Sequence, residues 1–237
     1  MKNALDLFAG TNSWGKVIEE SHNVISLDIT DYKGKHPKTH ICDILTWDYK
    51  IYPKNHFDII AAGCPCVFYS ILQLAWVDSK NGRKKRCKKT GKLYVYTKEL
   101  YQKDLEYSDK LVKKTLEIIK YFKPRLWFIE NPYSSKLKSR PFMKDLNFYV
   151  IDYCAYGFDY KKPTIIFTNK KEFIPKRCLK NKCHSIMKYQ KLSNTKRKKH
   201  LLTTGSWGNG IQKGVGGGDN RLKRYVVPKK LIKALIN

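Results

Sequence analysis

The sequence predicts an α/β fold with a mostly parallel sheet, and three observations lead to that class. Short apolar runs alternate with segments of helical spacing along the first 65 residues, as in βαβ units. A length of 237 residues suits one domain, or one domain with a small appendage. A hydrophobic content of 42% supplies a core and excludes a disordered tail protein.

The first part of the chain contains the expected parallel strands. Trp14, Val17 and Ile18 recur at helical spacing, which predicts a helix over 14–21. Short apolar runs bounded by turn residues are typical of parallel strands that are buried on both faces. Such runs predict strands over 3–8, 24–28, 39–42 and 57–62.

The second part is predicted in the same way. A stripe of Leu111, Ile118 and Phe122 predicts a helix over 105–122, which Pro124 ends. An antiparallel hairpin is expected around Tyr156-Gly157. The remaining predicted elements are a buried strand over 125–129, hairpin strands over 148–153 and 164–168, and a helix over 226–236.

Positive charge dominates the composition, with 48 Lys and Arg against 20 Asp and Glu, a formal net charge of +28. Such a chain attracts polyanions in a salt-dependent way, so nucleic acid is the expected partner and an anionic membrane surface the alternative. Only eight of the 48 are Arg, so a coding sequence rich in A and T would produce a similar bias without binding. The basic segment 79–90 is expected to be a mobile surface loop, and periodicity fades over 170–219.

Targeting signals and cysteine usage indicate the compartment. No apolar run reaches the roughly 18 residues of a membrane-spanning helix, and residues 1–6 lack the apolar core of a signal peptide. We therefore expect no membrane insertion and an intracellular protein of the cytoplasm or nucleus, not a secreted one. Seven cysteines, an odd number, predict reduced thiols, one of which is chemically active.

A ligand site is expected where the first strand turns into the first helix. Asp6-Leu7-Phe8-Ala9-Gly10 leads into a tight turn, and a helix N-terminus leaves backbone N–H groups free for a nucleotide-like ligand. Asp28, at the end of the next strand, is placed to accept hydrogen bonds from ribose hydroxyls. The turn lacks the G-x-G-x-x-G dinucleotide pattern, and a plain strand–helix connection is the alternative.

Two reactive side chains follow buried strands. Pro65-Cys66 comes after the strand over 57–62, and ligands of open parallel sheets lie beyond the carboxyl ends of the strands. A buried structural cysteine is the alternative, and Cys64 is a competing nucleophile. Glu130 follows another apolar strand, where a half-desolvated carboxyl suits a proton donor or an acceptor for a ring N–H and an amino group. A helix cap or an ion pair with a lysine is its structural alternative.

In their order and spacing, these motifs resemble the signature motifs of the cytosine-C5 DNA methyltransferases. That family has D-L-F-x-G near its start, a P-C nucleophile loop and E-N-V at the end of a later strand, and its small viral and phage-type members carry E-N-P. The resemblance covers most of 1–168 and the last 18 residues. The matching segments are Asp6-Leu7-Phe8-Ala9-Gly10, Gly63-x-Pro65-Cys66-x-x-x-Ser70, Glu130-Asn131-Pro132, the run from Tyr156 to Thr164, and the tail from Asp219 to Pro228.

The resemblance implies a Rossmann-like S-adenosylmethionine-dependent methyltransferase fold with a small irregular target-recognition region. It divides the chain into a catalytic domain over 1–169, a target-recognition region over 170–219 and a C-terminal segment over 220–237 that returns to the catalytic domain. It also implies a monomer that methylates C5 of cytosine in double-stranded DNA, with the target base flipped out of its stack.

Residue roles follow from the same resemblance. The thiolate of Cys66 would add to C6 of the base while Glu130 holds N3 and the exocyclic amine, and surrounding lysines and a helix N-terminus are expected to lower the pKa of that thiol. The implied catalytic residues are Cys66, Glu130, Pro65, Asn131 and Lys162. The implied S-adenosylmethionine-binding residues are Phe8, Ala9, Gly10, Thr11, Asp28, Ile29, Asp43 and Ile44.

The chain departs from the family pattern in three places. Asn12 and Ser13 replace two glycines of the first turn, and Asn is the residue besides Gly that best tolerates positive φ. Lys162 and Thr164 stand where the family has arginines, and a lysine lacks the bidentate guanidinium fork. The basic segment 79–90 resembles an insertion after the nucleophile loop, in the part that closes over the target.

Other interpretations stay open. The alternatives are an RNA cytosine-C5 methyltransferase, a catalytically idle nucleic-acid-binding protein on the same scaffold, and an oxidoreductase on a dinucleotide-binding fold. Cys178-x4-Cys183-His184, with His200, has spacing within the range of a zinc site. Reduced thiols in a basic loop are the alternative there, and no metal is assigned.

Overall fold

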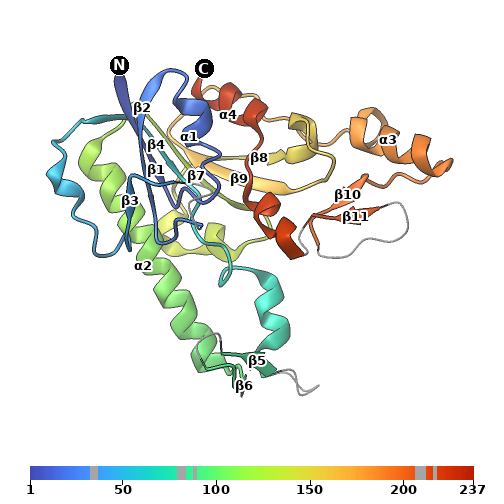
Figure 1. Ribbon diagram of the computed structural model, residues 1–237, viewed down its shortest axis with the longest axis horizontal. Helices are drawn as coiled ribbons and strands as arrows, with labels where there is room; N and C mark the ends of the chain where they lie inside the picture. The colour runs from blue at the N-terminus through green and yellow to red at the C-terminus, as the bar shows by residue number, and fades with distance from the viewer. Residues whose placement is uncertain (33–36, 79–83, 88–89, 206–211, 216–217) are drawn as a thin grey trace.

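A seven-stranded sheet forms the centre of the computed structural model, which describes residues 1–32, 37–78, 84–87, 90–205, 212–215 and 218–237 (Figure 1). The strand order is β3-β2-β1-β4-β7-β9-β8; β9 runs antiparallel to both of its neighbours, and every other pair is parallel. This arrangement confirms the predicted α/β class. The strands are β1 (Lys2–Leu7), β2 (His22–Asp28), β3 (His40–Ile41), β4 (Phe57–Ala62), β7 (Leu126–Pro132), β8 (Phe148–Asp152) and β9 (Pro163–Thr168).

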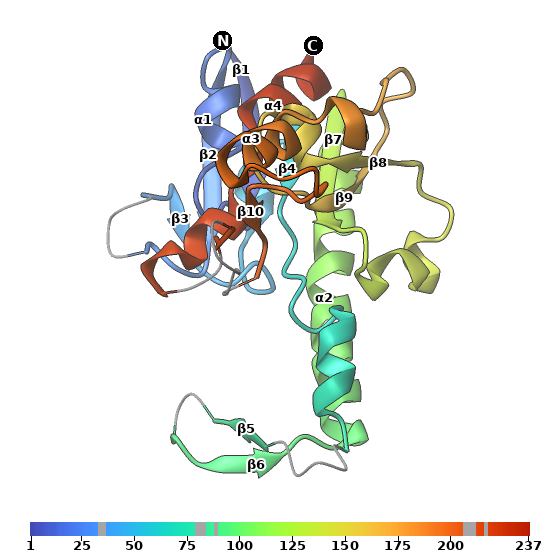
Figure 2. The same cartoon turned by 90° about the vertical axis from the view of Figure 1, so that its right-hand side faces the viewer.

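Helices cover both faces of the sheet (Figures 1 and 2). Successive residues of a strand point to opposite faces, so neighbours on one strand enter different cores. Leu5 packs in the core with α2 (Lys98–Phe122). Ala4 packs in the opposite core with α1 (Gly15–Ile18) and α4 (Lys229–Ile236). None of the described helices is both long and apolar enough to cross a membrane.

Three helices differ in length from the prediction, and one of them is α4, which begins at Lys229 instead of at 226 because Pro228 is its N-cap residue. The helix α2 begins at Lys98 rather than at 105, because Thr97 Oγ1 accepts a hydrogen bond from the N–H of Leu100 at 3.3 Å and Tyr101 is buried. The helix predicted over 14–21 is reduced to the four residues of α1, since Trp14 before it and residues 19–21 after it lie in turns.

The last two strands of the sheet are antiparallel, as predicted, but their place in the sheet was not predicted. The strand β9 lies between β7 and β8 instead of at the edge. The strand β7 also continues through Glu130-Asn131-Pro132, because Glu130 pairs with Ile166 of β9. Glu130 is therefore held by a strand, not by a loop.

A projection that we call the arm stands away from the sheet (Figure 2). It consists of η2 (Ile71–Trp76), β5 (Lys84–Arg86), β6 (Leu93–Val95) and the first turns of α2. The prediction of a mobile loop over 79–90 is wrong for β5, which pairs antiparallel with β6; residues 79–83 and 88–89 lie outside the described residues. Lys85 Nζ lies 3.0 Å from the Tyr96 ring centroid, a cation–π contact that fixes the strand on the arm.

The segment 170–219 contains more regular structure than its sequence indicates. It includes the ten-residue helix α3 (His184–Ser193), with Ile186 and Tyr189 buried, and the short parallel pair β10 (Leu202–Thr203) and β11 (Lys213–Gly214). The apolar stripe of α3 is short, and lysines obscure it in the sequence.

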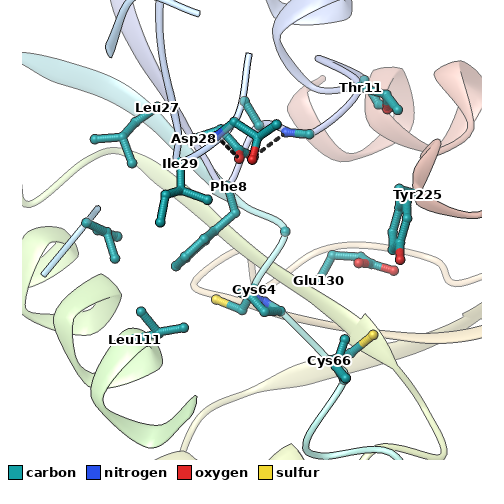
Figure 3. Close-up of a pocket in the computed structure, with 18 of the residues that line it drawn as sticks. Phe8, Thr11, Leu27, Asp28, Ile29, Cys64, Cys66, Leu111, Glu130 and Tyr225 are labelled. Carbon is teal, nitrogen blue, oxygen red and sulfur yellow. Dashed lines mark hydrogen bonds between the residues drawn. The ribbon is translucent and has the colours of Figure 1, made fainter. Parts of the chain in front are cut away.

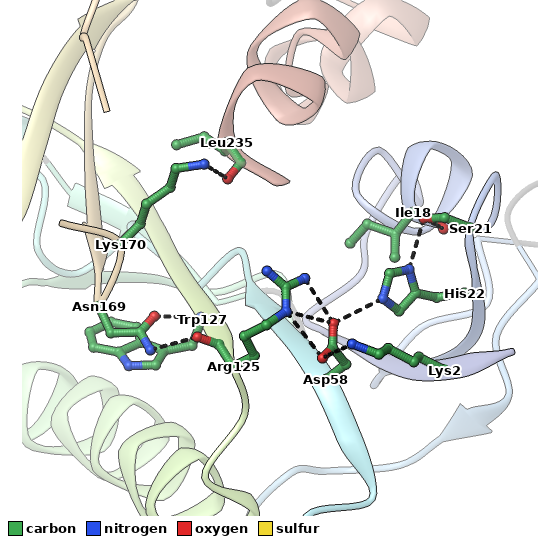
Figure 4. Close-up of polar contacts among 10 residues, drawn as sticks. All are labelled: Lys2, Ile18, Ser21, His22, Asp58, Arg125, Trp127, Asn169, Lys170 and Leu235. Atoms are coloured by element: carbon green, nitrogen blue, oxygen red, sulfur yellow. Dashed lines mark hydrogen bonds and ion pairs between the residues drawn. The ribbon is translucent and has the colours of Figure 1, made fainter. Parts of the chain in front are cut away.

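At the amino ends of the strands, Asp58 of β4 joins three neighbouring elements (Figure 4). Its carboxylate accepts hydrogen bonds from Lys2 Nζ at 3.0 Å, His22 Nε2 at 3.1 Å and Arg125 Nη2 at 2.9 Å. Burial alone would raise the pKa of Asp58, but these partners outweigh it and hold the pKa well below its usual range. The polar groups at this edge are thus paired with each other.

Candidate active site

The carboxyl ends of β1, β2, β4 and β7 open onto one cavity of about 520 Å³ (Figure 3). Every residue predicted to bind the methyl donor lines it, and Asn131 alone of the predicted catalytic residues does not. The predicted residues in the wall are Phe8, Ala9, Gly10, Thr11, Asp28, Ile29, Asp43, Ile44, Pro65, Cys66, Glu130 and Lys162. The fold thus gathers side chains from distant parts of the sequence into one site.

The first turn is tight because three of its residues have positive φ. Gly10 has φ of 49°, and Asn12, which replaces a family glycine, has φ of 55°. Phe8 has φ of 53°, a conformation that is strained for a bulky residue and that is often found at ligand sites. The turn therefore folds as the family glycines would allow and presents backbone to the cavity.

Asp28 closes this turn from the neighbouring strand. Its Oδ2 accepts a hydrogen bond from Gly10 N at 2.9 Å, and its Oδ1 accepts one from Thr30 N at 3.0 Å, both visible in Figure 3. Each carboxylate oxygen can accept a second bond. The side chain can therefore hold the turn and still accept a hydroxyl from a ligand.

Asp6 takes a role that the sequence did not indicate. Its Oδ2 accepts the hydrogen bond of Gly15 N at 3.0 Å, so the N–H that was expected to stay free for a ligand at the start of α1 is used within the protein. Burial raises the pKa of Asp6 to about 7, against the opposing effect of that hydrogen bond. The carboxyl is a structural support behind the turn.

The two cysteines after β4 point in different directions (Figure 3). The Cys64 sulfur is directed toward Leu111 of α2, whereas the Cys66 sulfur is directed toward the side of the cavity that holds Glu130. Cys64 is only 3% exposed, and burial raises the pKa of its thiol to about 12. Cys66 is partly exposed, so its sulfur is the one that a ligand can reach.

The charge around Cys66 differs from the expectation. Burial raises the pKa of the Cys66 thiol, and the negative charge of Glu130 raises it further. Lys162 acts in the opposite direction but does not outweigh them. The helix that follows this loop is the 3₁₀ helix η2, which begins only at Ile71, and among the described residues no helix N-terminus is one of the causes that act on this pKa. The predicted lowering of this pKa is therefore wrong for the protein without ligands.

Glu130 is fixed by two donors on one of its oxygens. Its Oε1 accepts hydrogen bonds from the Tyr153 hydroxyl at 3.0 Å and from Lys162 Nζ at 3.2 Å. Lys162 also donates to the carbonyl oxygen of Arg224 at 3.2 Å, which connects the C-terminal segment to the site. Among the described residues, no hydrogen bond reaches Oε2, so that oxygen is available to a ligand.

Comparison with known proteins identifies the family. No protein-family profile matches the chain. A protein of Frog virus 3 (isolate Goorha), assigned as a DNA (cytosine-5)-methyltransferase, is 31% identical over 238 residues, which cover 98% of each chain. This chain belongs to the DNA (cytosine-5)-methyltransferase family. The resemblance seen in the motifs is thereby confirmed.

A solved structure was also found for comparison with this methyltransferase. It is a prophage-encoded protein of E. coli assigned as a DNA modification methyltransferase, with a TM-score of 0.46 and 12% identity. The match covers 71% of this chain and 46% of the other, so this chain spans about half the length of that protein.

The loop of the methyltransferase that carries Cys66 is anchored by the motif residue Asn131 and by Asp109 and Arg140, which lie outside the motifs. Asn131 Nδ2 donates to the Cys64 carbonyl oxygen at 3.0 Å, so this residue positions the loop instead of lining the cavity. The Tyr69 hydroxyl donates to Asp109 Oδ1 at 2.8 Å, and Arg140 Nε donates to the same oxygen at 3.0 Å. Nothing in the sequence indicates the contact between Tyr69 and Asp109, because one lies in a loop and the other on a helix.

The methyltransferase cavity also includes residues that were not predicted to line it. Tyr107, Ser108 and Leu111 come from α2, and Tyr225 and Val227 come from the C-terminal segment. The apolar stripe of α2 predicts that Leu111 is buried. Only the packing of the helix against the sheet shows that Leu111 also lines the cavity.

Proposed function

We propose that this chain transfers a methyl group from S-adenosylmethionine to C5 of cytosine in double-stranded DNA, through a covalent bond between Cys66 and C6 of a flipped base. The observation that carries the proposal is the single cavity, with Asp28 at one end and Cys66 beside Glu130 at the other. Membership of the family supports DNA methylation as the activity. We further propose that the protein acts as a monomer inside the cell.

The donor end of the cavity fits S-adenosylmethionine. Asp28 has oxygen lone pairs left for ribose hydroxyls. Ile29 beside it is 67% exposed and gives an adenine ring an apolar surface to pack on. Bound there, S-adenosylmethionine would supply the methyl group as an electrophile. The first turn would hold the methionine part through Phe8 to Thr11.

The acceptor end supplies a nucleophile. Cytosine C5 is unreactive, and the addition of the Cys66 sulfur to C6 makes it nucleophilic: the S–C6 bond forms and the C5=C6 electron pair moves to C5. C5 gains the methyl group as the methyl–sulfonium bond of the donor would break; the C5 proton is then lost to water, its electron pair reforms C5=C6, and Cys66 leaves as the thiolate. Because burial and Glu130 raise the pKa of Cys66, we expect its proton to leave only when the base is bound.

Glu130 would hold the base during this addition. Its Oε2 is the oxygen available to N3, while Tyr153 and Lys162 fix the other oxygen in place. A carboxyl that shares a proton with N3 and accepts from the exocyclic amine stabilises the charge that develops on the ring. Lys162 holds the carboxyl as a positioning residue and keeps this charge balanced.

We also propose that the chain is divided into the three parts that its sequence predicts. The segment 170–219 would read the bases, and its helix α3 lies outside the central sheet. The C-terminal segment returns to the catalytic part, where Lys229 Nζ and Lys233 Nζ pair with Glu20 at 2.8 and 2.7 Å. Leu231 and Leu235 are buried against the sheet there.

Bisulfite sequencing of DNA from cells that express the chain tests this function. We expect converted libraries to retain cytosines at a fixed short site in cells with the wild-type chain and to lose them with Cys66→Ser. A parallel bisulfite analysis of total RNA addresses the alternative substrate. Retained cytosines in RNA alone would assign the activity to RNA, and retention in neither would contradict a cytosine-C5 methyltransferase.

A further inference from the structure

Four side chains with metal-binding atoms converge at a second place in the molecule, outside the catalytic cavity. Cys154 lies in η5 (Tyr153–Tyr156), directly after β8. Cys178 and Cys183 belong to the segment before α3, and His200 belongs to the segment before β10. Their three sulfur atoms and one imidazole nitrogen all lie within 4.8 Å of one another.

The spacing of these atoms fits a tetrahedral ion. With Zn–S bonds of about 2.3 Å and Zn–N bonds of about 2.0 Å, the edges of a tetrahedron are roughly 3.5–3.8 Å long. Cys178 Sγ and His200 Nε2 are 3.4 Å apart. Because all four ligand atoms lie within 4.8 Å of one another, small side-chain shifts are enough to bring them to these distances. Three soft sulfur ligands and one imidazole are a donor set that selects zinc over harder cations.

The surrounding protein holds the four ligands in place. Asp152 Oδ2 accepts hydrogen bonds from Cys178 N and from Arg177 Nε, both at 2.9 Å. The side-chain Nε2 of Gln212 donates to the His200 carbonyl oxygen at 2.8 Å. Cys183 is the N-cap residue of α3. These contacts fix the backbone positions of the ligands, as hydrogen bonds around the ligands of a metal site commonly do.

His184, the nearest histidine in the sequence, is not part of the group. Its Nε2 lies 3.2 Å from Asp159 Oδ1, an ion-pair distance. The ligand that replaces it is Cys154, which precedes Cys178 by 24 residues and which the spacing of Cys178, Cys183 and His184 could not reveal.

We propose that Cys154, Cys178, Cys183 and His200 bind one structural zinc ion. Binding displaces one proton from each of the three thiols, and the neutral imidazole donates through Nε2. The resulting complex carries one negative charge, and the two positive charges of Lys161 and Arg177, which pair with Asp152, balance the complex and that carboxylate together. With four protein ligands the ion has no open position, so its role is structural.

The ion would connect two parts of the chain. Cys154 follows a strand of the central sheet, whereas the other three ligands belong to the segment 170–219. Cys154 is also the neighbour of Tyr153, whose hydroxyl binds Glu130. The metal therefore fastens the segment proposed to read DNA onto the element that supports the catalytic carboxyl.

Metal analysis of the full-length protein tests this proposal independently of methyl transfer. Protein expressed with zinc and purified under reducing conditions is analysed for metal per chain by mass spectrometry. We expect close to one zinc ion in the wild type and a loss of about tenfold or more in Cys178→Ser, because one missing thiolate opens the site. Cys87→Ser and His184→Gln, which alter a cysteine and a histidine outside the group, should keep the wild-type content.

Two further measurements test the proposal even if Cys178→Ser fails to fold. His200→Cys preserves four ligands and should retain zinc. Replacement of zinc by Co²⁺ in the wild type should give the visible absorption of tetrahedral thiolate coordination, and this spectrum should change in His200→Cys. Folded wild-type protein that holds no zinc after incubation with zinc and reductant would overturn the proposal. So would wild-type metal content in Cys178→Ser, or a disulfide among the three cysteines in reduced protein.

Discussion

The two cysteine sites of this protein differ in how many metal-binding atoms lie around each sulfur atom, since both sites line a cavity of similar size. Cys66 stands on the wall of a cavity of about 520 Å³, with one carboxyl and one lysine acting on its thiol. Cys178 is surrounded by two other sulfurs and an imidazole within 4.8 Å. A single thiol beside a carboxyl can react with a substrate, whereas three thiols and an imidazole so close together can share one metal ion. We therefore propose that the same residue type serves chemistry in one place and structure in the other.

The largest expected effect is the loss of methyl transfer in Cys66→Ser. The hydroxyl cannot replace the thiolate in the addition to C6, so turnover should fall by several orders of magnitude. Zinc content and thermal stability should stay at the wild-type level, because Cys66 lies outside the four-ligand group. Cys64→Ser is the matched control and should keep most of the activity. Equal losses in the two variants, measured with a labelled methyl donor, would remove the distinction between these thiols.

Glu130→Gln sharpens the account of the first site. The amide keeps the shape but cannot carry the proton, so turnover should fall by about 10²–10⁴-fold, the usual effect of a positioned acid or base. Donor affinity, measured by calorimetry, should change little because Glu130 lies at the other end of the cavity from Asp28. A collapse of donor affinity would mean that Glu130 supports the fold instead of the base.

Cys178→Ser should produce the opposite pattern to Cys66→Ser. Loss of a structural ion lowers stability, and we expect the Tm to fall by roughly 5–15 °C, since each kcal/mol shifts Tm by roughly 2–4 °C in a chain of this size. Turnover by the protein that stays folded should be reduced far less than in Cys66→Ser. Differential scanning calorimetry with and without a zinc chelator checks this, and an unchanged wild-type Tm after chelation would contradict it.

The pH dependence of thiol alkylation separates the charges acting on Cys66. Only the thiolate reacts, and burial and Glu130 raise the pKa of Cys66, so the rate of modification should rise through a midpoint above that of an ordinary thiol. Removal of the negative charge in Glu130→Gln should move the midpoint to lower pH. Removal of the positive charge in Lys162→Met should move it to higher pH. Peptide mass spectrometry follows Cys66 alone, and a wild-type midpoint below the ordinary value would contradict these charge effects.

The smallest effects are expected on the arm, which belongs to neither cysteine site. Lys84 of β5 and Lys92, which directly precedes β6, are exposed there, and substituting each with alanine should weaken binding a few-fold on all DNA sequences alike. The slope of log affinity against log salt should fall by about one for each lysine that no longer neutralises a phosphate. The methylated site should stay short, at about two to four base pairs, because few side chains of 170–219 can reach a groove.

Lys54→Ala is the control for the arm, because Lys54 precedes β4 at the amino ends of the strands. It removes one exposed charge of the same kind and should leave the affinity and the salt slope nearly unchanged. A methylation map in which an arm variant changes the recognised bases would show that the arm reads sequence.

The difference between the two sites also explains what the sequence could predict. The residues of the catalytic cavity stand at the ends of strands, and apolar runs reveal where strands end, so Asp28, Cys66 and Glu130 could be placed at one sheet edge. The second site could not be found, because Cys154 meets the other ligands only through the fold. The pKa of Cys66 was also mispredicted, since the count of lysines says nothing about burial.

The fold shows the same limit. Strand positions along β1, β2 and β4 follow from local apolar patterns, and the structure has them within a few residues. The strand β5 was missed because its lysines suggest solvent, whereas Lys85 packs on the ring of Tyr96. The place of β9 between two strands depends on pairing across the sheet, which no local pattern contains.

The most direct test of the account is the covalent complex with DNA that carries 5-fluorocytosine. Fluorine at C5 cannot leave as a proton does, so the S–C6 bond formed by the enzyme should persist. With S-adenosylmethionine present, we expect wild-type protein and Cys64→Ser to form a stable adduct, which peptide mass spectrometry locates at Cys66, and Cys66→Ser to form none. No adduct with the wild-type protein, or an adduct at another cysteine, would contradict the assignment of Cys66 as the nucleophile.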